Sequence, residues 1–198
     1  MIELIDMHNA EPYKKFLKYY SSALKANQYL VEAISITSFS KLNNEVNSRY
    51  VNLKHIHDES WIFFSNYNSP KAIEFQNHNQ VSALFYWNSI NVQIRMKAEI
   101  KKTPNEYNQK YFSDRSVEKN ALAISSKQSK PIDSYSQVKE NYNKSLKNDD
   151  LKKCPEFWGG YSFTPYYFEF WEGHESRLNK REVYEKSNDS WKHLFLQP

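Results

Sequence analysis

The chain has 198 residues, and its 27 Lys and Arg against 23 Asp and Glu give a formal net charge of +4. So modest a charge, with acids and bases interspersed, argues against the broad basic surface of a nucleic-acid-binding protein. Aromatic residues make up 16% of the chain while Gly numbers only 3, so much of the core must be built from Tyr, Phe and Trp.

Cysteine content and the N-terminal sequence restrict the kinds of site and the cellular location that we expect. The single cysteine, Cys154, excludes an internal disulfide and a cysteine-rich metal site, and the histidines show no metal-ligand spacing. The start mixes Glu3, Asp6 and His8 with short apolar pieces, unlike a signal peptide, and no run approaches about 18 consecutive apolar residues. Without internal repeats or linkers, we expect one cytoplasmic domain over residues 1–198, with no metal and no membrane contact.

The first half of the chain predicts one helix followed by strands. A proline near the start and apolar residues at helical spacing indicate an amphipathic helix over about 11–27. Alternating and β-branched residues then predict strands over 33–39, 49–55, 61–66, 81–87 and 91–101. Ser69 is placed to cap a short helix that runs to Asn77, with Pro70 in its first position. A helix N-terminus after a strand favours a bound anion, and Lys71 adds charge there.

The second half predicts helices first and strands last. Thr103 is placed to cap a helix that begins at Pro104, and two more helices are predicted over 117–126 and 134–146. Strands are predicted over 160–171, 181–186 and 191–196. Five or six strands in meanders interrupted by helices predict an antiparallel barrel with helices packed outside it, which is an α+β fold.

The most informative stretch runs from Phe168 to Arg181 and reads FEFWEGHESRLNKR. Its aromatic start is typical of a half-buried strand, and Gly173 then allows the chain to turn. Because a guanidinium is a planar fork of donors, Arg177 and Arg181 beside Trp171 indicate a site for a flat, negatively charged molecule. Taken alone, the same residues also fit a surface hairpin with a core tryptophan and two solvated arginines.

This stretch resembles the C-terminal signature of the pyridoxine (pyridoxamine) 5′-phosphate oxidase family, which consists of FMN enzymes. Family-like pieces occur in the same order from about Glu11 to Pro198, namely Arg49–Lys54, Phe64–Asn66, Ser69–Lys71, Leu84–Trp87, Lys110–Phe112, Ser126–Ser129 and Phe157–Tyr161. The resemblance implies an FMN-binding split β-barrel whose C-terminal signature segment spans 157–198. It also implies a homodimer with active sites at the subunit interface.

The resemblance assigns one set of residues to FMN, whose phosphate, ribityl chain and flat ring call for cations, small donors and an apolar wall. Arg49 and Lys71 would hold the phosphate with Ser65 and Ser129, and Trp171 would complete the ring pocket. The full implied set is Arg49, Lys54, Phe64, Ser65, Lys71, Gln93, Gln128, Ser129, Trp171 and Arg181. Without the resemblance, each of these residues could have a purely structural role, at the solvated end of a strand or helix or in the core.

The implied substrate is pyridoxine or pyridoxamine 5′-phosphate, oxidised to pyridoxal 5′-phosphate. A hydride would pass from its C4′ carbon to the flavin, and O2 would reoxidise the flavin and give H2O2. The resemblance places the substrate phosphate against two cations and a phenol and makes Arg177 and Asn179 the catalytic residues. The implied substrate-binding set is Lys54, Tyr111, Arg115, Lys119, Arg177 and Asn179.

Three positions depart from the family pattern. Pro70 stands where the family commonly has Arg, Lys119 where it has a small Ser, and Asn179 where it has an active-site His. Because Asn cannot titrate or stack as His does, we expect turnover or substrate choice to differ. Two alternatives stay open: a related flavin oxidase of the phenazine-biosynthesis type, and a non-catalytic FMN or pyridoxal-phosphate binding protein. The retained substrate-phosphate residues argue against the first.

Overall fold

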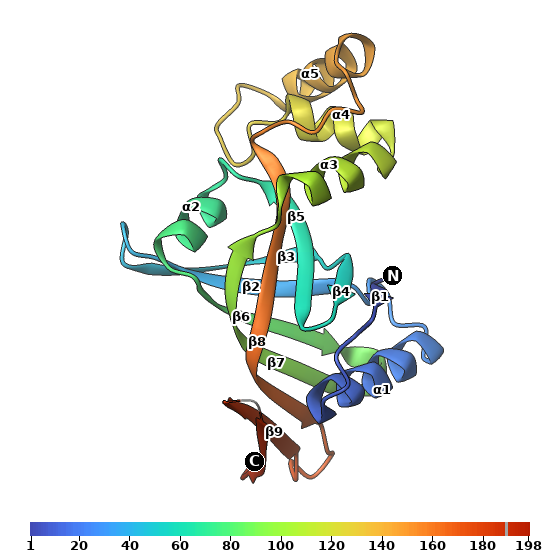
Figure 1. The fold of residues 1–198 in the computed structure, drawn as a ribbon, viewed down its shortest axis with the longest axis vertical. Helices are drawn as coiled ribbons and strands as arrows, with labels where there is room; N and C mark the ends of the chain where they lie inside the picture. The colour runs from blue at the N-terminus through green and yellow to red at the C-terminus, as the bar shows by residue number, and fades with distance from the viewer. Residues whose placement is uncertain (189) are drawn as a thin grey trace.

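The computed structural model describes residues 1–188 and 190–198, and these form one sheet of ten strands, five α-helices and a short 3-10 helix (Figure 1). Within these residues, no helix has the length and apolar content needed to cross a membrane. In chain order the elements are β1 (Glu3–Ile5), α1 (Glu11–Lys25), β2 (Ala33–Ser40), β3 (Glu45–Asn52), β4 (His55–His57), β5 (Ser60–Asn66), α2 (Pro70–Asn77), β6 (Gln80–Trp87), η1 (Asn88–Ile90), β7 (Val92–Lys102), α3 (Asn105–Asp114), α4 (Val117–Ser125), α5 (Tyr135–Asn148), β8 (Trp158–Glu172), β9 (Lys180–Ser187) and β10 (Ser190–Leu196).

The sheet follows the order β1-β4-β5-β8-β7-β6-β2-β3, while β9 pairs with the end of β8 and β10 pairs with β9. Its hydrogen-bonded path is not closed, because it ends at β1 on one side and at β3 on the other. Figure 1 shows β2 and β3 running across β5 and β8, with α3, α4 and α5 grouped at one end and the β9–β10 hairpin at the other. The predicted α+β class is confirmed.

Several local predictions are wrong. The structure has ten strands where eight were predicted, and β1 pairs with β4 in parallel, so the sheet is mixed rather than purely antiparallel. The strand predicted over 49–55 is divided, since β3 covers Glu45–Asn52 and His55–His57 forms β4. Strands of three residues are too short to show an alternating pattern.

Both predicted helix caps are also wrong as hydrogen-bonding caps. Ser69 occupies the N-cap position of α2, but its hydroxyl donates to the Asn66 carbonyl at 2.8 Å and accepts from no backbone N–H of the helix. The Thr103 hydroxyl donates to the Asn108 side chain at 2.5 Å, and Pro104 takes the N-cap position of α3. Each hydroxyl has a closer partner than the helix N–H groups, which local sequence does not reveal.

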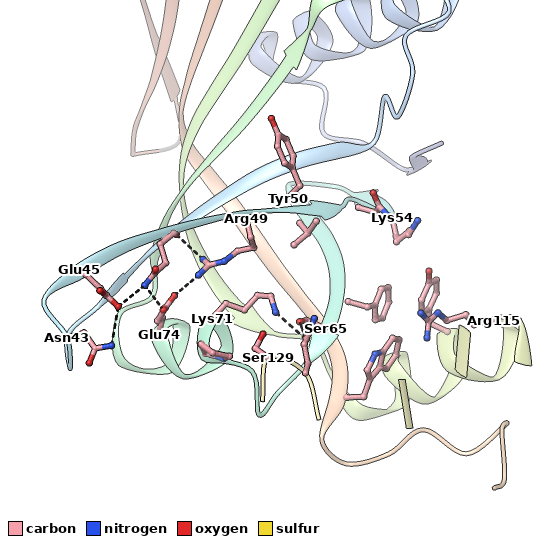
Figure 2. A pocket seen from close by; sticks show the side chains of 18 residues that line it. Asn43, Glu45, Arg49, Tyr50, Lys54, Ser65, Lys71, Glu74, Arg115 and Ser129 are labelled. Carbon is pink, nitrogen blue, oxygen red and sulfur yellow. Dashed lines mark hydrogen bonds and ion pairs between the residues drawn. The ribbon is translucent and has the colours of Figure 1, made fainter. Parts of the chain in front are cut away.

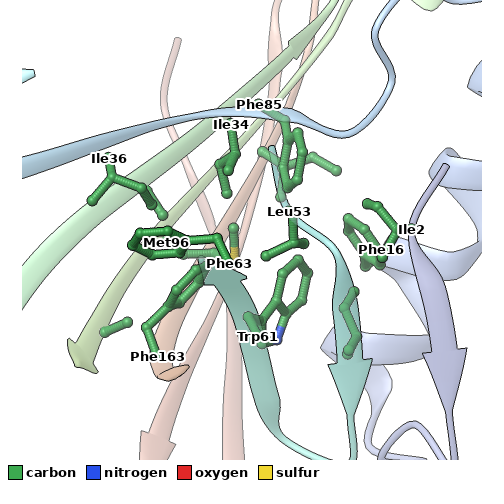
Figure 3. Close-up of a cluster of buried hydrophobic side chains, with 14 of the residues drawn as sticks. Ile2, Phe16, Ile34, Ile36, Leu53, Trp61, Phe63, Phe85, Met96 and Phe163 are labelled. Carbon is green, nitrogen blue, oxygen red and sulfur yellow. The ribbon is translucent and has the colours of Figure 1, made fainter. Parts of the chain in front are cut away.

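Aromatic rings make up nearly half of the buried core cluster and pack there with Ile, Leu, Val, Ala and Met (Figure 3). Trp61 of β5 is fully buried at its centre, with the ring of Phe16 from α1 edge-on at 4.5 Å between centroids. Phe163 of β8 stacks on the same indole at 5.9 Å. Such pairs add about 0.5–1.5 kcal/mol each beyond burial, so α1, β5 and β8 are held in a fixed relation.

A buried carboxylate connects the C-terminal hairpin to α1 through an ion pair. Glu182 of β9 accepts from Lys15 of α1 at 2.6 Å, from Tyr184 at 2.9 Å and pairs with Lys180 at 3.2 Å. Burial raises the pKa of Glu182, but these hydrogen bonds and charges outweigh it and bring the pKa to about 2. The ionised carboxylate therefore stabilises the folded state.

The substitution Glu182→Gln tests the contribution of this carboxylate to the free energy of unfolding. The pKa of Glu182 is lower in the folded protein than in the unfolded chain. Its carboxylate therefore stabilises the fold fully above about pH 4.5, and this stabilisation is lost as the pH falls towards about 2. The stabilisation is on the order of 2 kcal/mol. We expect the variant to be less stable than wild type at pH 7 and to lose less stability on acidification. Denaturant unfolding from pH 7 to pH 3 measures both. Parallel stability curves for the two proteins would contradict this role.

Candidate functional site

A cleft of about 760 Å³ opens between β3, β5, α2, α3 and the segment that follows α4. In the view of Figure 2, Arg49, Lys71 and Glu74 lie on one side of Ser65, and Lys54 and Arg115 lie on the other. The structure brings together nine of the predicted site residues in its lining: Arg49, Lys54, Phe64, Ser65, Lys71, Tyr111, Arg115, Gln128 and Ser129.

Arg49 of β3 is held rigidly at one end of this cleft. Its Nη1 donates to the Ser38 hydroxyl at 2.5 Å and to the Asn47 carbonyl at 3.0 Å, and its Nη2 pairs with the buried Glu74 carboxylate at 3.1 Å. Glu74 also accepts from the Asn47 amide at 3.0 Å. Since a guanidinium has five N–H donors, Arg49 keeps donors for a ligand, but Glu74 offsets part of its charge.

Lys71 stands beside Arg49 in the first turn of α2, where its side chain is buried. Its ammonium donates to the Ser69 hydroxyl at 3.0 Å and to the Gln128 side-chain oxygen at 3.2 Å. Burial and the neighbouring Arg49 charge lower the pKa of Lys71 to about 8, against a smaller raising effect of Glu74. Lys71 is therefore a desolvated cation that a bound anion would stabilise.

Three donors converge on one oxygen beside Lys71. The Gln128 Oε1 accepts from the Lys71 ammonium at 3.2 Å, from the Ser65 hydroxyl at 3.2 Å and from the Asn66 backbone N–H at 3.4 Å. A phosphate oxygen needs the same arrangement of a cation, a hydroxyl and an amide N–H around it. This end of the cleft therefore has the donor chemistry of a phosphate site.

A second group of cations lies at the other end of the cleft. Burial lowers the pKa of Lys54, and the positive charges of Lys119 and Arg115 lower it further. The negative charge of Glu32 partly offsets this lowering. Burial also lowers the pKa of Arg115, whose guanidinium lies 5.0 Å from the centre of the Trp158 ring. In the described part of the chain, neither Lys54 nor Arg115 forms an ion pair with a carboxylate. These cations form a second anion-binding group.

Stacked aromatic rings line the cleft beside the second group of cations. Phe64 of β5 lies parallel to Tyr111 of α3 at 3.7 Å between ring centroids, and to Trp158 at 5.2 Å. Burial raises the pKa of Tyr111, although Arg115 opposes the change. The Tyr111 phenol therefore stays protonated at neutral pH and can donate a hydrogen bond to an anion.

Three predicted cofactor residues lie elsewhere, in a row across β7, β8 and β9. Gln93 pairs with Trp171, and Trp171 pairs with Arg181, so the three side chains share one face of the sheet. We call Gln93, Trp171 and Arg181 the Trp171 row. It lines a separate pocket of about 260 Å³ together with Arg95 and Glu169. The structure therefore does not bring the Trp171 row into the cleft of the same chain.

The two predicted catalytic residues lie in the turn between β8 and β9. Arg177 is exposed and has a left-handed backbone, with a φ of 61°. The Asn179 side-chain oxygen accepts from the His174 N–H at 3.0 Å, which closes the turn. Neither residue lines the cleft or the pocket of the Trp171 row. Lys119 does line a small neighbouring pocket that shares Arg115 and Trp158 with the cleft.

Sequence reasoning missed three charged residues at these sites. Glu74 lies three positions after Lys71, which places both on one face of α2. Arg95 and Glu169 each lie two positions from a member of the Trp171 row, and residues two apart share a face of a strand. Because these spacings are visible in the sequence, the position of all three residues beside the predicted site residues could have been inferred from it. No group of three or more potential metal ligands occurs among residues 1–188 and 190–198.

Comparison with known proteins gives matches along nearly the whole chain. The sequence model of the pyridoxamine 5′-phosphate oxidase family matches residues 27–142, and that of the pyridoxine 5′-phosphate oxidase C-terminal dimerisation region matches 158–198. A pyridoxine/pyridoxamine 5′-phosphate oxidase from Colwellia psychrerythraea is 33% identical over 193 residues, covering 96% of this chain and 88% of that protein. A second, from Hydrogenovibrio crunogenus, is 31% identical over 192 residues, with 95% and 88% covered.

Solved structures agree with the fold. PhzG from Burkholderia lata, in complex with tetrahydrophenazine-1-carboxylic acid, superimposes with a TM-score of 0.89 at 25% identity, covering 96% of this chain and 93% of that one. A pyridoxamine 5′-phosphate oxidase-related, FMN binding protein from Nostoc punctiforme superimposes at 0.79 and 12% identity, covering 96% and 99%. That second likeness concerns the fold alone, and it confirms the predicted split barrel. From the family models and the curated relatives together, this chain belongs to the pyridoxamine 5′-phosphate oxidase family, a family of oxidoreductase flavoenzymes.

Proposed function

We propose that this protein is an FMN-dependent oxidase that converts pyridoxine or pyridoxamine 5′-phosphate to pyridoxal 5′-phosphate, with O2 as electron acceptor and H2O2 as product. The observation that carries the proposal is the presence of two groups of cations in one cleft, one around Lys71 and one around Arg115. A phosphorylated cofactor and a phosphorylated substrate that react face to face require two such groups. The relatives named as pyridoxine/pyridoxamine 5′-phosphate oxidases support the same assignment.

The residues around Lys71 suit the FMN phosphate and ribityl chain. Lys71 and Arg49 supply the positive charge, and the hydroxyls of Ser65 and Ser129 with the Gln128 amide supply neutral hydrogen-bonding groups. The oxygen on which Ser65, Asn66 and Lys71 converge is presently that of Gln128. We infer that a phosphate oxygen takes this place and that Gln128 turns to another part of the cofactor.

The second group would hold the substrate phosphate and so orient the ring. Lys54 and Arg115 would contribute charge, and the protonated Tyr111 phenol would donate a hydrogen bond. Bound FMN supplies the oxidising chemistry, namely removal of a hydride from the substrate C4′ carbon and delivery of two electrons to O2. The protein's own contribution is to fix both phosphates, and therefore both rings, in a reactive orientation.

We further propose a homodimer in which each active site uses two chains. The match of residues 158–198 to a dimerisation region supports this, because that segment carries the Trp171 row, Arg177 and Asn179. In one chain these residues lie apart from the cleft. A partner could place its own Trp171 row and its own Arg177 against the cleft, where they would contact the flavin and the substrate ring.

Aerobic turnover tests the proposal directly. Purified protein loaded with FMN should be yellow and should convert pyridoxine or pyridoxamine 5′-phosphate to pyridoxal 5′-phosphate with one H2O2 per aldehyde. Arg115→Met should raise KM for the phosphorylated substrate by about tenfold or more, because a charge-assisted hydrogen bond is lost, and should leave FMN affinity unchanged. Flavin-loaded protein that produces neither aldehyde nor peroxide would refute the oxidase assignment.

A second candidate is an oxidase of the PhzG type, favoured by the structural match to PhzG. It predicts turnover of an unphosphorylated polycyclic acid and no dependence on Arg115. Lys54 and Arg115 argue for a phosphorylated substrate, since two half-buried cations and the Tyr111 hydroxyl suit a phosphate dianion better than a single carboxylate. Comparing turnover of tetrahydrophenazine-1-carboxylic acid with that of pyridoxine 5′-phosphate separates the two.

Lys71 predicts how FMN affinity depends on pH. Its pKa of about 8 means that the ammonium is charged below pH 8 and neutral above it, and only the charged form attracts phosphate. FMN affinity should be constant from pH 6.5 to 7.5 and fall by up to about tenfold per pH unit above 8. Lys71→Arg stays charged throughout and serves as the matched control, so its affinity should not fall in this range. An equal decline in both proteins, measured by flavin fluorescence titration, would assign the effect to another group.

A further inference from the structure

A second row of charged residues lies beside the Trp171 row on the same face of the sheet. Arg95 of β7 pairs with Glu169 of β8, two residues along the strands from Gln93 and Trp171. Because side chains two residues apart point to the same side, Arg95 and Glu169 lie next to Gln93, Trp171 and Arg181. All five line the same pocket.

Glu169 is the centre of a dense set of hydrogen bonds and ion pairs. It is 5% exposed, and its Oε1 accepts a hydrogen bond from Arg181 Nε at 2.8 Å and forms an ion pair with Arg181 Nη2, also at 2.8 Å. Its Oε2 accepts from the Tyr167 hydroxyl at 2.9 Å and pairs with Arg95. Burial raises the pKa of Glu169, but the bonds from Arg181 and Tyr167 and the Arg95 charge outweigh it and leave the pKa below its usual value. The carboxylate is therefore ionised at neutral pH.

These contacts fix the orientation of Arg181. Its Nε donates to Glu169 Oε1, its Nη2 pairs with the same oxygen, and its Nη1 donates to the Gln197 carbonyl at 3.1 Å. A long arginine side chain is otherwise free to adopt many rotamers, at a cost of up to about 2 kcal/mol when it is ordered. The contacts with Glu169 meet this cost before any ligand binds, so that Arg181 is preorganised beside Trp171.

We propose that Glu169 is a positioning residue: it holds Arg181 towards the flavin ring and sets the charge that the ring experiences. The proposal rests on the FMN-binding function proposed above. Arg95, Arg181 and Glu169 together carry a net charge of +1, from two cations and one anion. Positive charge close to a flavin favours its reduced, more negative form, so Glu169 moderates the cofactor's reduction potential.

Glu169→Gln tests the proposal with little change in shape. A glutamine amide has one acceptor oxygen, and its NH2 group would face a guanidinium, so it cannot hold both arginines. We expect FMN affinity to fall about tenfold, as for loss of a hydrogen bond to a charged group, and the flavin midpoint potential to become more positive. Arg95→Gln removes a cation instead and should make the potential more negative. Arg95 is half exposed, so Arg95→Gln should fold. Its midpoint potential therefore still tests the proposal if Glu169→Gln does not fold.

Glu182→Gln is the matched control. Glu182 is 6% exposed and also binds cations, but it follows Arg181 on β9 and so points to the opposite face. This variant should be destabilised and yet keep the FMN affinity and midpoint potential of wild type. If Glu169 were only structural, both variants would show lower stability alone.

Two further measurements decide whether Glu169 acts through Arg181. In a double-mutant cycle, adding Glu169→Gln to Arg181→Lys should weaken FMN binding little beyond Arg181→Lys alone, whereas additive losses would overturn the proposal. In the FMN-free protein, the Arg181 Nε–H proton should exchange slowly with solvent in wild type and quickly in Glu169→Gln. Failure of wild type to bind FMN would refute the proposed function, while the exchange measurement would still test the positioning. Equal exchange, or unchanged affinity and potential, would overturn the proposal.

Discussion

The structure depends on cations that the fold desolvates without giving them a carboxylate partner. Elsewhere, buried charges are paired: Glu182 with Lys15, and Glu169 with Arg181. In the cleft, Lys71 is buried with only neutral hydrogen-bond partners. Lys54 is half buried near Lys119 and Arg115, and the Glu32 charge only partly offsets its desolvation. Burying an unpaired charge costs free energy that folding does not recover. Such an arrangement is expected where a bound anion provides the missing charge, and the cleft holds two groups of this kind.

The sheet explains how distant segments supply these groups. β3 and β5 lie far apart in strand order, yet they contact each other where the open sheet turns upon itself, and α2 and α3 follow strands that end at the same place. The aromatic core around Trp61 keeps these elements in a fixed relation, so the cations do not need the ligand to bring them together. The Trp171 row uses the opposite end of β8, beyond the reach of its own cleft. One long strand therefore carries parts of two different sites.

Much of the fold follows from the sequence because its longer elements have clear periods. The helix α1 and the strands β2, β5, β6 and β7 were predicted within a few residues, whereas β1 and β4 were missed because three residues show no pattern. Arg49, Lys71 and Arg115 were predicted for one site only through the family resemblance, since nothing in their local sequence connects them. Glu169 and Glu74 were missed because the family resemblance identifies residues that contact ligands and not the residues that orient them.

The central claim is that one cleft and a partner's Trp171 row together form each active site. It is tested most directly with mixed dimers of two inactive variants, Lys71→Ala and Arg181→Ala, co-expressed with different affinity tags and purified in succession. One of the two sites in each mixed dimer would combine an intact cleft with an intact row, so we predict about half of the wild-type FMN content and turnover per dimer. Mixed dimers that remain as inactive as the parent homodimers would show that each site lies within a single chain, and would contradict the account.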